Sequence, residues 1–130
     1  MSRRSKLFSD AGELLEALCR SAARDPSLSD RARRLLLPLE RADVERGSRL
    51  RETLQAYYQC SGSVARTAER LFLHRNSVRY RLDHIRALLG CDIDDVATAA
   101  ALMAAFGIVD LGGAAAAVNE GIRHETQRAQ

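Results

Sequence analysis

The chain has 130 residues, of which 46% are hydrophobic and 28% are charged, and its formal net charge at pH 7 is +3. This length fits one domain, or one domain with an appended helical segment, and the apolar content argues against a wholly disordered chain. No run approaches the roughly 20 apolar residues that span a bilayer, so we expect no membrane partner.

The N-terminal third predicts short helices separated by proline and glycine. Asp10, with a glutamate three residues later, resembles a capping box and predicts the start of a helix that ends at Asp25-Pro26. A second helix is expected to start at Ser29 and to be broken or restarted by Pro38, because proline lacks the N–H of a helix interior. The short helix that follows should end at Gly47.

The rest of the chain also has helical spacing. Ser48 is expected to cap a helix that ends at Ser61-Gly62. After two more helices, Gly90 should adopt a left-handed conformation, and one residue of the pair Asp94-Asp95 should cap a final apolar helix. From Gly112 onward the sequence predicts a loosely attached helix or a frayed end. Because no stretch alternates with period two, the predicted fold class is all-α, a helical bundle.

The segment from residue 63 to residue 86 differs from the rest in charge. It holds six arginines against Glu69 and Asp83, a net charge of +4, so the remainder of the +3 chain sums to −1. Its residues predict two short helices joined by a tight turn, the layout of a helix-turn-helix that enters a DNA major groove. A basic excess confined to one pair of helices is an electrostatic footprint for phosphate.

The second of these helices has two distinct faces. At 100° per residue one apolar stripe is expected to pack against the first helix, and it consists of Val78, Leu82, Ile85 and Leu89. The opposite face carries Asn76, Ser77, Tyr80 and His84, with Arg75, Arg79 and Arg81 at its edges. Side chains in the first turns of a recognition helix reach base edges, whereas flanking arginines meet phosphates.

These residues resemble a known family. The run from Ser63 to Leu82, with the flanking sequence over roughly residues 48 to 108, resembles the C-terminal DNA-binding domain of PucR-type transcriptional regulators. More remotely, it is similar to the helix-turn-helix of the Fis nucleoid protein. That similarity implies DNA-facing positions at Ser63, Ala65, His74, Arg75, Ser77, Arg79 and Tyr80, and the charge and face patterns add Arg66, Arg70, Asn76 and Arg81.

Some of these residues have alternative roles. In one alternative, the ring of Tyr80 packs sideways into the core and does not contact DNA. In another, His74 only caps the second helix. Arg66, Arg70 and Arg86 are as well explained by solvation as by contact with DNA, whereas Arg75 and Arg79 are the arginines that we favour for contact.

The predicted organisation has three parts. Residues 1–47 form an N-terminal helical segment that serves as a linker or dimerisation region, residues 48–110 the helix-turn-helix domain, and residues 111–130 a tail. PucR-type regulators usually carry a sensory region and a cyclase-like domain, for which 130 residues leave no room. The chain is therefore expected to be either a fragment or a stand-alone protein, and we expect no small-molecule effector to bind it.

The predicted function is that of a DNA-binding transcriptional regulator, or its DNA-binding end, which reads the major groove of double-stranded DNA with the helix around residues 75–89. The alternative is a helical protein-interaction module or a nonspecific DNA-packaging module of the nucleoid type. A homodimer is expected, because one helix-turn-helix reads few base pairs and relatives commonly pair two copies. Its candidate interface is Leu14, Leu15 and Leu18 with the cluster Leu35-Leu36-Leu37, unless these leucines close a monomeric core.

The sequence contains no motif that indicates catalysis or cofactor binding. The sequence has no His-Glu-x-x-His, Cys-x-x-Cys or glycine-rich phosphate loop, so we expect no enzyme, cofactor or metal. The acidic pair Asp94-Asp95 is better explained as a helix cap than as a catalytic dyad. Cys19, Cys60 and Cys91 are odd in number and far apart, which favours free thiols in a reducing bacterial cytoplasm, where the protein would associate with the nucleoid.

Overall fold

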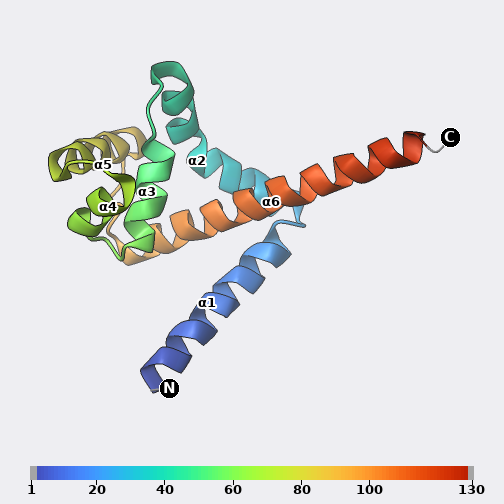
Figure 1. The fold of residues 1–130 in the computed structure, drawn as a ribbon, viewed down its shortest axis with the longest axis horizontal. Helices are drawn as coiled ribbons and strands as arrows, with labels where there is room; N and C mark the ends of the chain where they lie inside the picture. Colours follow the sequence, from blue (N-terminus) through green and yellow to red (C-terminus); the bar gives the residue numbers. More distant parts are fainter. Residues whose placement is uncertain (1–2, 129–130) are drawn as a thin grey trace. The chain divides into compact units, whose positions relative to one another are not determined.

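The computed structural model describes the backbone of residues 3–128 and the side chains of residues 9–112. Over that part of the chain the fold is all-α, as predicted, and no strand is present (Figure 1). The helices are α1 (Arg3–Ala22), α2 (Pro26–Arg46), α3 (Leu50–Gln59), α4 (Val64–Leu71), α5 (Arg75–Leu89) and α6 (Val96–Arg128). None of the helices in the described part has the length and apolar character that a membrane crossing requires.

Packing divides the chain into two compact units. One consists of Met1–Arg33 together with Ala104–Gln130, and the other of Arg34–Met103. The boundaries between these units fall inside α2 and inside α6. The three-part organisation expected from the sequence stays a prediction.

Within the first unit, α1 meets α6 at a cysteine. Cys19 is the only buried residue among the α1 side chains that the structure describes, and its Sγ lies 3.7 Å from the carbonyl oxygen of Ala104. A Cβ at Gly107 would come within 2.7 Å of that sulfur, so the absence of a side chain there permits the contact. Burial raises the pKa of the Cys19 thiol above its ordinary value.

The starts of α1 and α2 differ from the prediction. α1 begins at Arg3, so Asp10 lies inside the helix and the predicted capping box is wrong, because residues 3–9 contain no proline or glycine to stop a helix. α1 does end just before Asp25, as expected. The carboxylate of Asp25 accepts hydrogen bonds from the backbone N–H groups of Ser27 (2.9 Å) and Leu28 (3.4 Å), and therefore α2 starts at Pro26 rather than at Ser29.

Pro38 lies inside α2 and does not end it, so the predicted break is wrong. Its ring removes one backbone donor, but its fixed φ is compatible with a helix. Leu36 and Leu39, on either side of it, are completely buried. Burial of these two leucines offsets the lost hydrogen bond, since a fully buried leucine contributes about 1.5–3 kcal/mol.

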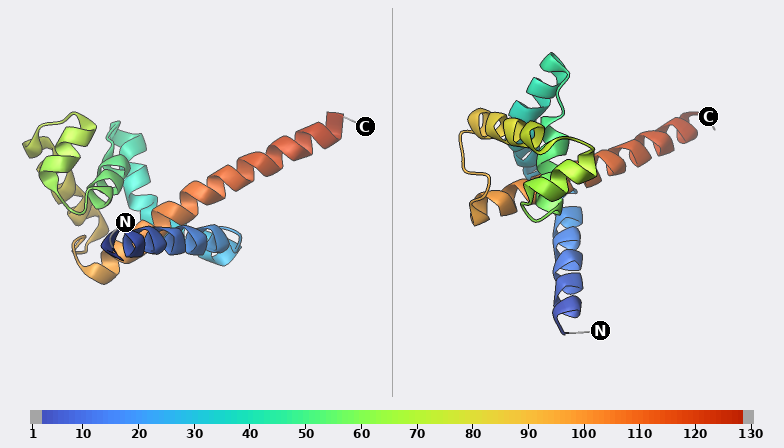
Figure 2. Two further views of the ribbon diagram at one scale, coloured as in Figure 1. Left: turned by 60° about the horizontal axis from the view of Figure 1, so that its bottom comes forward. Right: turned by 60° about the vertical axis from the view of Figure 1, so that its left-hand side comes forward.

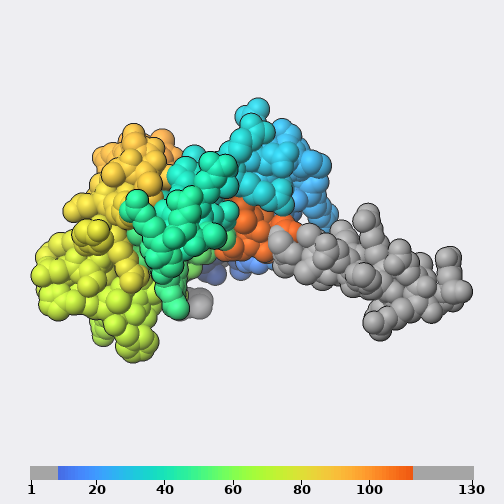
Figure 3. Space-filling view, turned by 90° about the horizontal axis from the view of Figure 1, so that it is seen from above, coloured from blue at the N-terminus to red at the C-terminus, as the bar shows by residue number. Residues whose placement is uncertain are grey.

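The corner between α2 and α3 is held by Asp43. Gly47 ends α2 with φ +63°, as predicted. The Asp43 carboxylate then accepts hydrogen bonds from the backbone N–H groups of Leu50 (2.7 Å) and Arg51 (3.1 Å) and from the hydroxyl of Ser48 (2.8 Å). Contrary to the prediction, Ser48 does not cap α3, because a carboxylate from the preceding helix takes that role. In Figure 3 the teal surface of this corner adjoins the yellow surface of α5.

The helices α3, α4 and α5 pack against one another in the second unit (Figure 2). Val78, Leu82 and Ile85 of α5 are buried as the stripe predicted, whereas Leu89 is half-buried. Their neighbours in this core include a set of completely or almost completely buried residues from α3, α4 and the segment before α6: Leu50, Thr53, Leu54, Tyr57, Thr67, Ala68 and Ile93. The core thus fixes which face of α5 remains exposed.

The connection before α6 follows the predicted pattern. Gly90 ends α5 in the left-handed conformation, with φ +64°. The Asp95 carboxylate accepts hydrogen bonds from the backbone N–H (3.0 Å) and the hydroxyl (2.9 Å) of Thr98, and these bonds lower the pKa of that carboxyl. Of the predicted pair, Asp95 is therefore the residue that caps α6.

The turn between α4 and α5 contains a strained residue. Phe72 has φ +56° and ψ +43°, a left-handed conformation that residues with a Cβ rarely adopt, and its side chain is 95% exposed. Replacing Phe72 with glycine should therefore raise the free energy of unfolding by about 0.5–1 kcal/mol, because relief of strain exceeds the added flexibility of the unfolded chain. Urea denaturation would measure this change.

Phe72→Ala is the matched control for this prediction. It removes the exposed ring but keeps the Cβ, so its stability should stay close to that of the unchanged protein. A glycine variant no more stable than the alanine variant would contradict the assignment of strain to the backbone.

Candidate nucleic-acid interface

The start of α4 is organised by Ser63. Its Oγ accepts a hydrogen bond from the backbone N–H of Arg66 at 3.2 Å, which caps the helix. Ala65 and Arg66 are exposed in the first turn of α4, and Arg70 is exposed in its last turn. The exposed residues Ala65 and Arg66 thus lie beside the N-terminus of α4, where the remaining backbone N–H groups and the helix dipole favour an anion.

The start of α5 is organised by His74. Its Nδ1 accepts a hydrogen bond from the backbone N–H of Asn76 at 3.1 Å, so the capping role that the sequence left open is present. Arg75, Asn76 and Ser77 are exposed in the first turn of α5. The cap fixes how these three side chains leave the helix, and contact of His74 with DNA stays a prediction.

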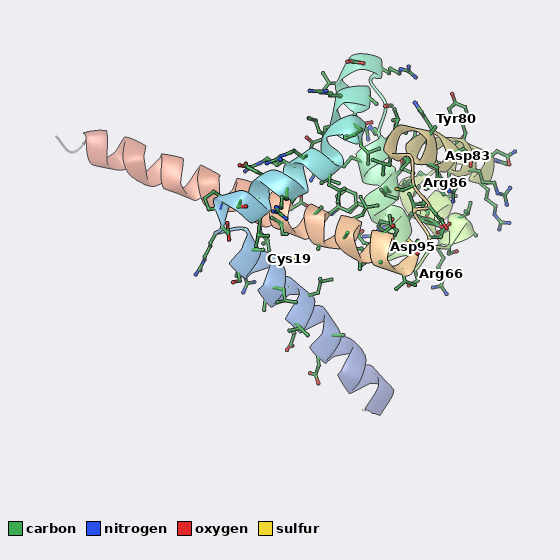
Figure 4. All side chains as sticks on the ribbon, turned by 180° about the vertical axis from the view of Figure 1, so that it is seen from behind. Cys19, Arg66, Tyr80, Asp83, Arg86 and Asp95 are labelled. Carbon is green, nitrogen blue, oxygen red and sulfur yellow. The ribbon has the colours of Figure 1, made fainter. Side chains whose placement is uncertain are left out.

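The middle of α5 presents an aromatic residue to solvent. Tyr80 is 73% exposed, so the alternative in which its ring packs into the core is wrong (Figure 4). Its ring centroid lies 6.5 Å from that of His84, one turn further along the same face. Arg79 is exposed beside them and donates a hydrogen bond to the Asn76 side-chain oxygen at 3.4 Å.

Arg81 lies differently from the other predicted contact residues. It is half-buried, and its Nη1 donates a hydrogen bond to the hydroxyl of Thr53 on α3 at 3.2 Å. The structure therefore brings Arg75, Asn76, Ser77, Arg79 and Tyr80 to one exposed region of α5, while Arg81 is directed toward α3.

Arg86 is engaged within the protein. Its guanidinium meets the carboxylates of Asp83 at 3.0 Å and Asp94 at 3.2 Å. Asp94 also accepts a hydrogen bond from the hydroxyl of Tyr57 at 2.6 Å, and the hydroxyl of Tyr58 donates to the carbonyl oxygen of Ile93 at 2.8 Å. Arg86 thus links α5 to the segment before α6, a role that the sequence did not indicate, and its contact with phosphate stays a prediction.

The pKa values of the two tyrosines in this network are raised. Burial, followed by the hydrogen bond to Asp94, raises the pKa of Tyr57 to about 12. Burial also raises the pKa of Tyr58. Both hydroxyls therefore stay protonated at neutral pH and serve as hydrogen-bond donors.

One residue beside the interface was missed from the sequence. Arg46, the last residue of α2, places its Nη1 at 3.5 Å from Nε2 of His84 on α5. The two residues are 38 positions apart, and no local pattern connects them.

Comparisons with known proteins agree with this geometry. Residues 50–108 match the family model for the PucR C-terminal helix-turn-helix domain. An uncharacterized protein of Mycobacterium tuberculosis is 45% identical over 49 residues, which cover 38% of this chain and 12% of that protein. An uncharacterized protein of Thermomonospora curvata is 48% identical over 64 residues, covering 49% of this chain and 35% of that protein.

A third similar protein, an uncharacterized protein of Haemophilus influenzae, is 39% identical over 67 residues and is covered over 18% of its length. The chain thus spans only a minor part of each of these relatives. No solved structure matches the chain. The family match, the predicted motif and the packing of α3, α4 and α5 lead to one conclusion: residues 50–108 are a PucR-type C-terminal helix-turn-helix domain.

Proposed function

We propose that this chain is a DNA-binding transcriptional regulator, or the DNA-binding end of a longer one, and that α5 enters the major groove. The observation that carries the proposal is the division of α5 into a buried stripe and an exposed face rich in hydrogen-bonding groups and positive charge. The proposed role is binding rather than catalysis.

In this proposal some exposed residues contact base edges and others contact the DNA backbone. Asn76, Ser77 and Tyr80 are exposed in the first two turns of α5, the part of a recognition helix that contacts base edges, and an asparagine amide can bond an adenine in a bidentate way. Arg75 and Arg79 flank them and reach either guanine edges or phosphates. Ser63, Ala65, Arg66 and Arg70 of α4, with His74 at the turn, would meet the DNA backbone. Arg81 is proposed only as a peripheral contact, since it is bonded to Thr53.

The salt dependence of binding tests this proposal. If Arg75 neutralises a phosphate, Arg75→Ala should weaken binding and lower the slope of log affinity against log salt by about one unit. Arg41→Ala is the matched control, because Arg41 is exposed on α2 and its replacement removes the same charge outside the proposed interface. Equal affinity and slope for both variants would contradict the proposed DNA-facing surface.

A mobility-shift assay separates the alternatives. A sequence-specific regulator keeps its complex in the presence of excess random DNA, whereas a packaging module loses it, and a protein-interaction module gives no shift. The DNA used would come from the genomic sites that the chain protects.

We further propose that the functional unit is a homodimer formed through α1. Leu14 and Leu18 are 61% and 58% exposed on this helix, and Leu15 is 37% exposed. A helix with an exposed apolar face is only marginally stable in water by itself, so pairing with a second copy of α1 would stabilise it. The Leu35-Leu36-Leu37 cluster contributes less than expected, because Leu36 is completely buried within the chain itself.

Light scattering tests the dimer. The single chain has a mass of 14.3 kDa, so a doubled mass is expected at micromolar concentration and should be lost in Leu18→Asp with folding intact. Val44→Asp, at an 87% exposed position of α2, is the control and should leave the mass doubled. A mass near 14.3 kDa for the unchanged protein, with and without DNA, would contradict the dimer.

A further inference from the structure

Arg46 carries a positive charge that no carboxylate of the described residues neutralises. Two other arginines of the same unit are paired with carboxylates, since Arg51 meets Glu40 at 3.2 Å and Arg86 meets Asp83 and Asp94. The contact of Arg46 is instead the imidazole of His84. Since a guanidinium can only donate, a hydrogen bond in this contact is accepted by Nε2 of His84, and an imidazole nitrogen that accepts orients Arg46 without cancelling its charge.

The contact places Arg46 beside the exposed face of α5. His84 lies one helical turn after Tyr80, and the two ring centroids are 6.5 Å apart. The guanidinium of Arg46 thus extends the face formed by exposed Tyr80 and half-buried His84 onto the end of α2. In Figure 3 this corner and α5 form adjoining parts of one surface.

The α2–α3 corner holds Arg46 on rigid backbone. Asp43 bonds the first N–H groups of α3 from within α2, and Gly47 makes the sharp turn between the two helices. A cation that is already positioned loses less conformational entropy when it binds an anion. Arg49, whose side chain is 72% exposed, follows on the same corner and lines a hollow with Arg81.

We propose that Arg46, oriented by His84, contacts a phosphate of double-stranded DNA beside the third turn of α5. A helix in the major groove has phosphates along both walls of a groove that is about 12 Å wide. The start of α4 would meet one wall and the α2–α3 corner the other. The interface then extends beyond the helix-turn-helix, onto a residue outside the 50–108 segment that matches the family. This inference rests on the proposed DNA binding.

The test compares four variants of the full chain, Arg46→Ala, Arg46→Lys, Arg41→Ala and Arg75→Ala, by fluorescence anisotropy on specific and on random DNA over a range of salt concentrations. Arg46→Ala should weaken binding about 3- to 10-fold near physiological salt and lower the log-log salt slope by about one unit. The loss should be equal on both DNA sequences, since a phosphate contact carries no base information. Arg46→Lys should restore the slope, and Arg41→Ala should bind like the unchanged protein.

Two outcomes would overturn this inference while leaving DNA binding in place. If Arg75→Ala weakens binding but Arg46→Ala does not, the α2–α3 corner is outside the interface. If Arg46→Ala lowers only the preference for the specific sequence and leaves the salt slope unchanged, Arg46 acts by positioning α5. Absence of any complex with the unchanged protein would instead contradict the proposed function itself.

Discussion

Replacing Leu82 with alanine is expected to lower the free energy of unfolding by about 2–5 kcal/mol. Leu82 is 1% exposed, and Val78 and Ile85 on the same stripe are completely buried. Truncation therefore removes apolar contacts and leaves a cavity in the core that α3, α4 and α5 share. Because a domain of this size is stable by only about 5–15 kcal/mol, the loss should be evident in thermal and urea melts.

Ser77→Ala is the control on the opposite face of the same helix. Its side chain is exposed, so the change in stability should stay within about 0.5 kcal/mol, although DNA affinity should fall if Ser77 meets a base. A harmless Leu82→Ala would mean that α5 turns a different face toward the core.

The two faces of α5 could be predicted because they depend on a repeating local pattern. A stripe at intervals of three and four residues points in one direction on any helix, whatever packs against it. Val78, Leu82 and Ile85 are buried for that reason. Gly47 and Gly90 were predictable on similar grounds, since a left-handed residue after a helix favours glycine.

The helix starts could not be predicted in the same way. The cap of α3 comes from Asp43, seven residues before the backbone N–H of Leu50 that it bonds, and Ser48 between them was the more obvious local candidate. α2 passes through Pro38 because Leu36 and Leu39 are buried on both sides of it. Local propensity contains neither of these tertiary effects.

Similar limits apply to the candidate site. A count of charges treats the arginines of residues 63–86 alike, but contacts distant in sequence decide which of them face solvent. Arg81 is bonded to Thr53, 28 positions away, and Arg86 to Asp94, whereas Arg75 and Arg79 remain exposed. Arg46 joins the same surface through a contact across 38 positions. The family resemblance locates the motif, and the packing distinguishes its charges.

Asp94→Ala is expected to lower the free energy of unfolding by about 2 kcal/mol, while Asp83→Ala should change it by less than about 0.5 kcal/mol. Both carboxylates meet Arg86, but their ion pairs are substantially exposed and solvent screens them. Of these two carboxylates, only that of Asp94 also accepts a hydrogen bond from the hydroxyl of Tyr57, a residue that is 6% exposed. Asp94→Ala therefore leaves the largely buried hydroxyl of Tyr57 without a good acceptor, and this accounts for most of the expected loss of stability.

A double-mutant cycle with Tyr57→Phe isolates that hydrogen bond. Tyr57→Phe and Asp94→Ala should be strongly non-additive, with a coupling of about 1–2 kcal/mol at pH 7, because each removes the same bond. The raised pKa of Tyr57, about 12, sets the direction of the pH dependence. The stabilisation should be fully present below pH 10, the ordinary pKa of tyrosine, and should be lost as the pH rises through about 12, where the folded protein also loses the proton. Additive effects at pH 7, or equal losses for Asp83→Ala and Asp94→Ala, would show that Asp94 acts only as a surface partner of Arg86.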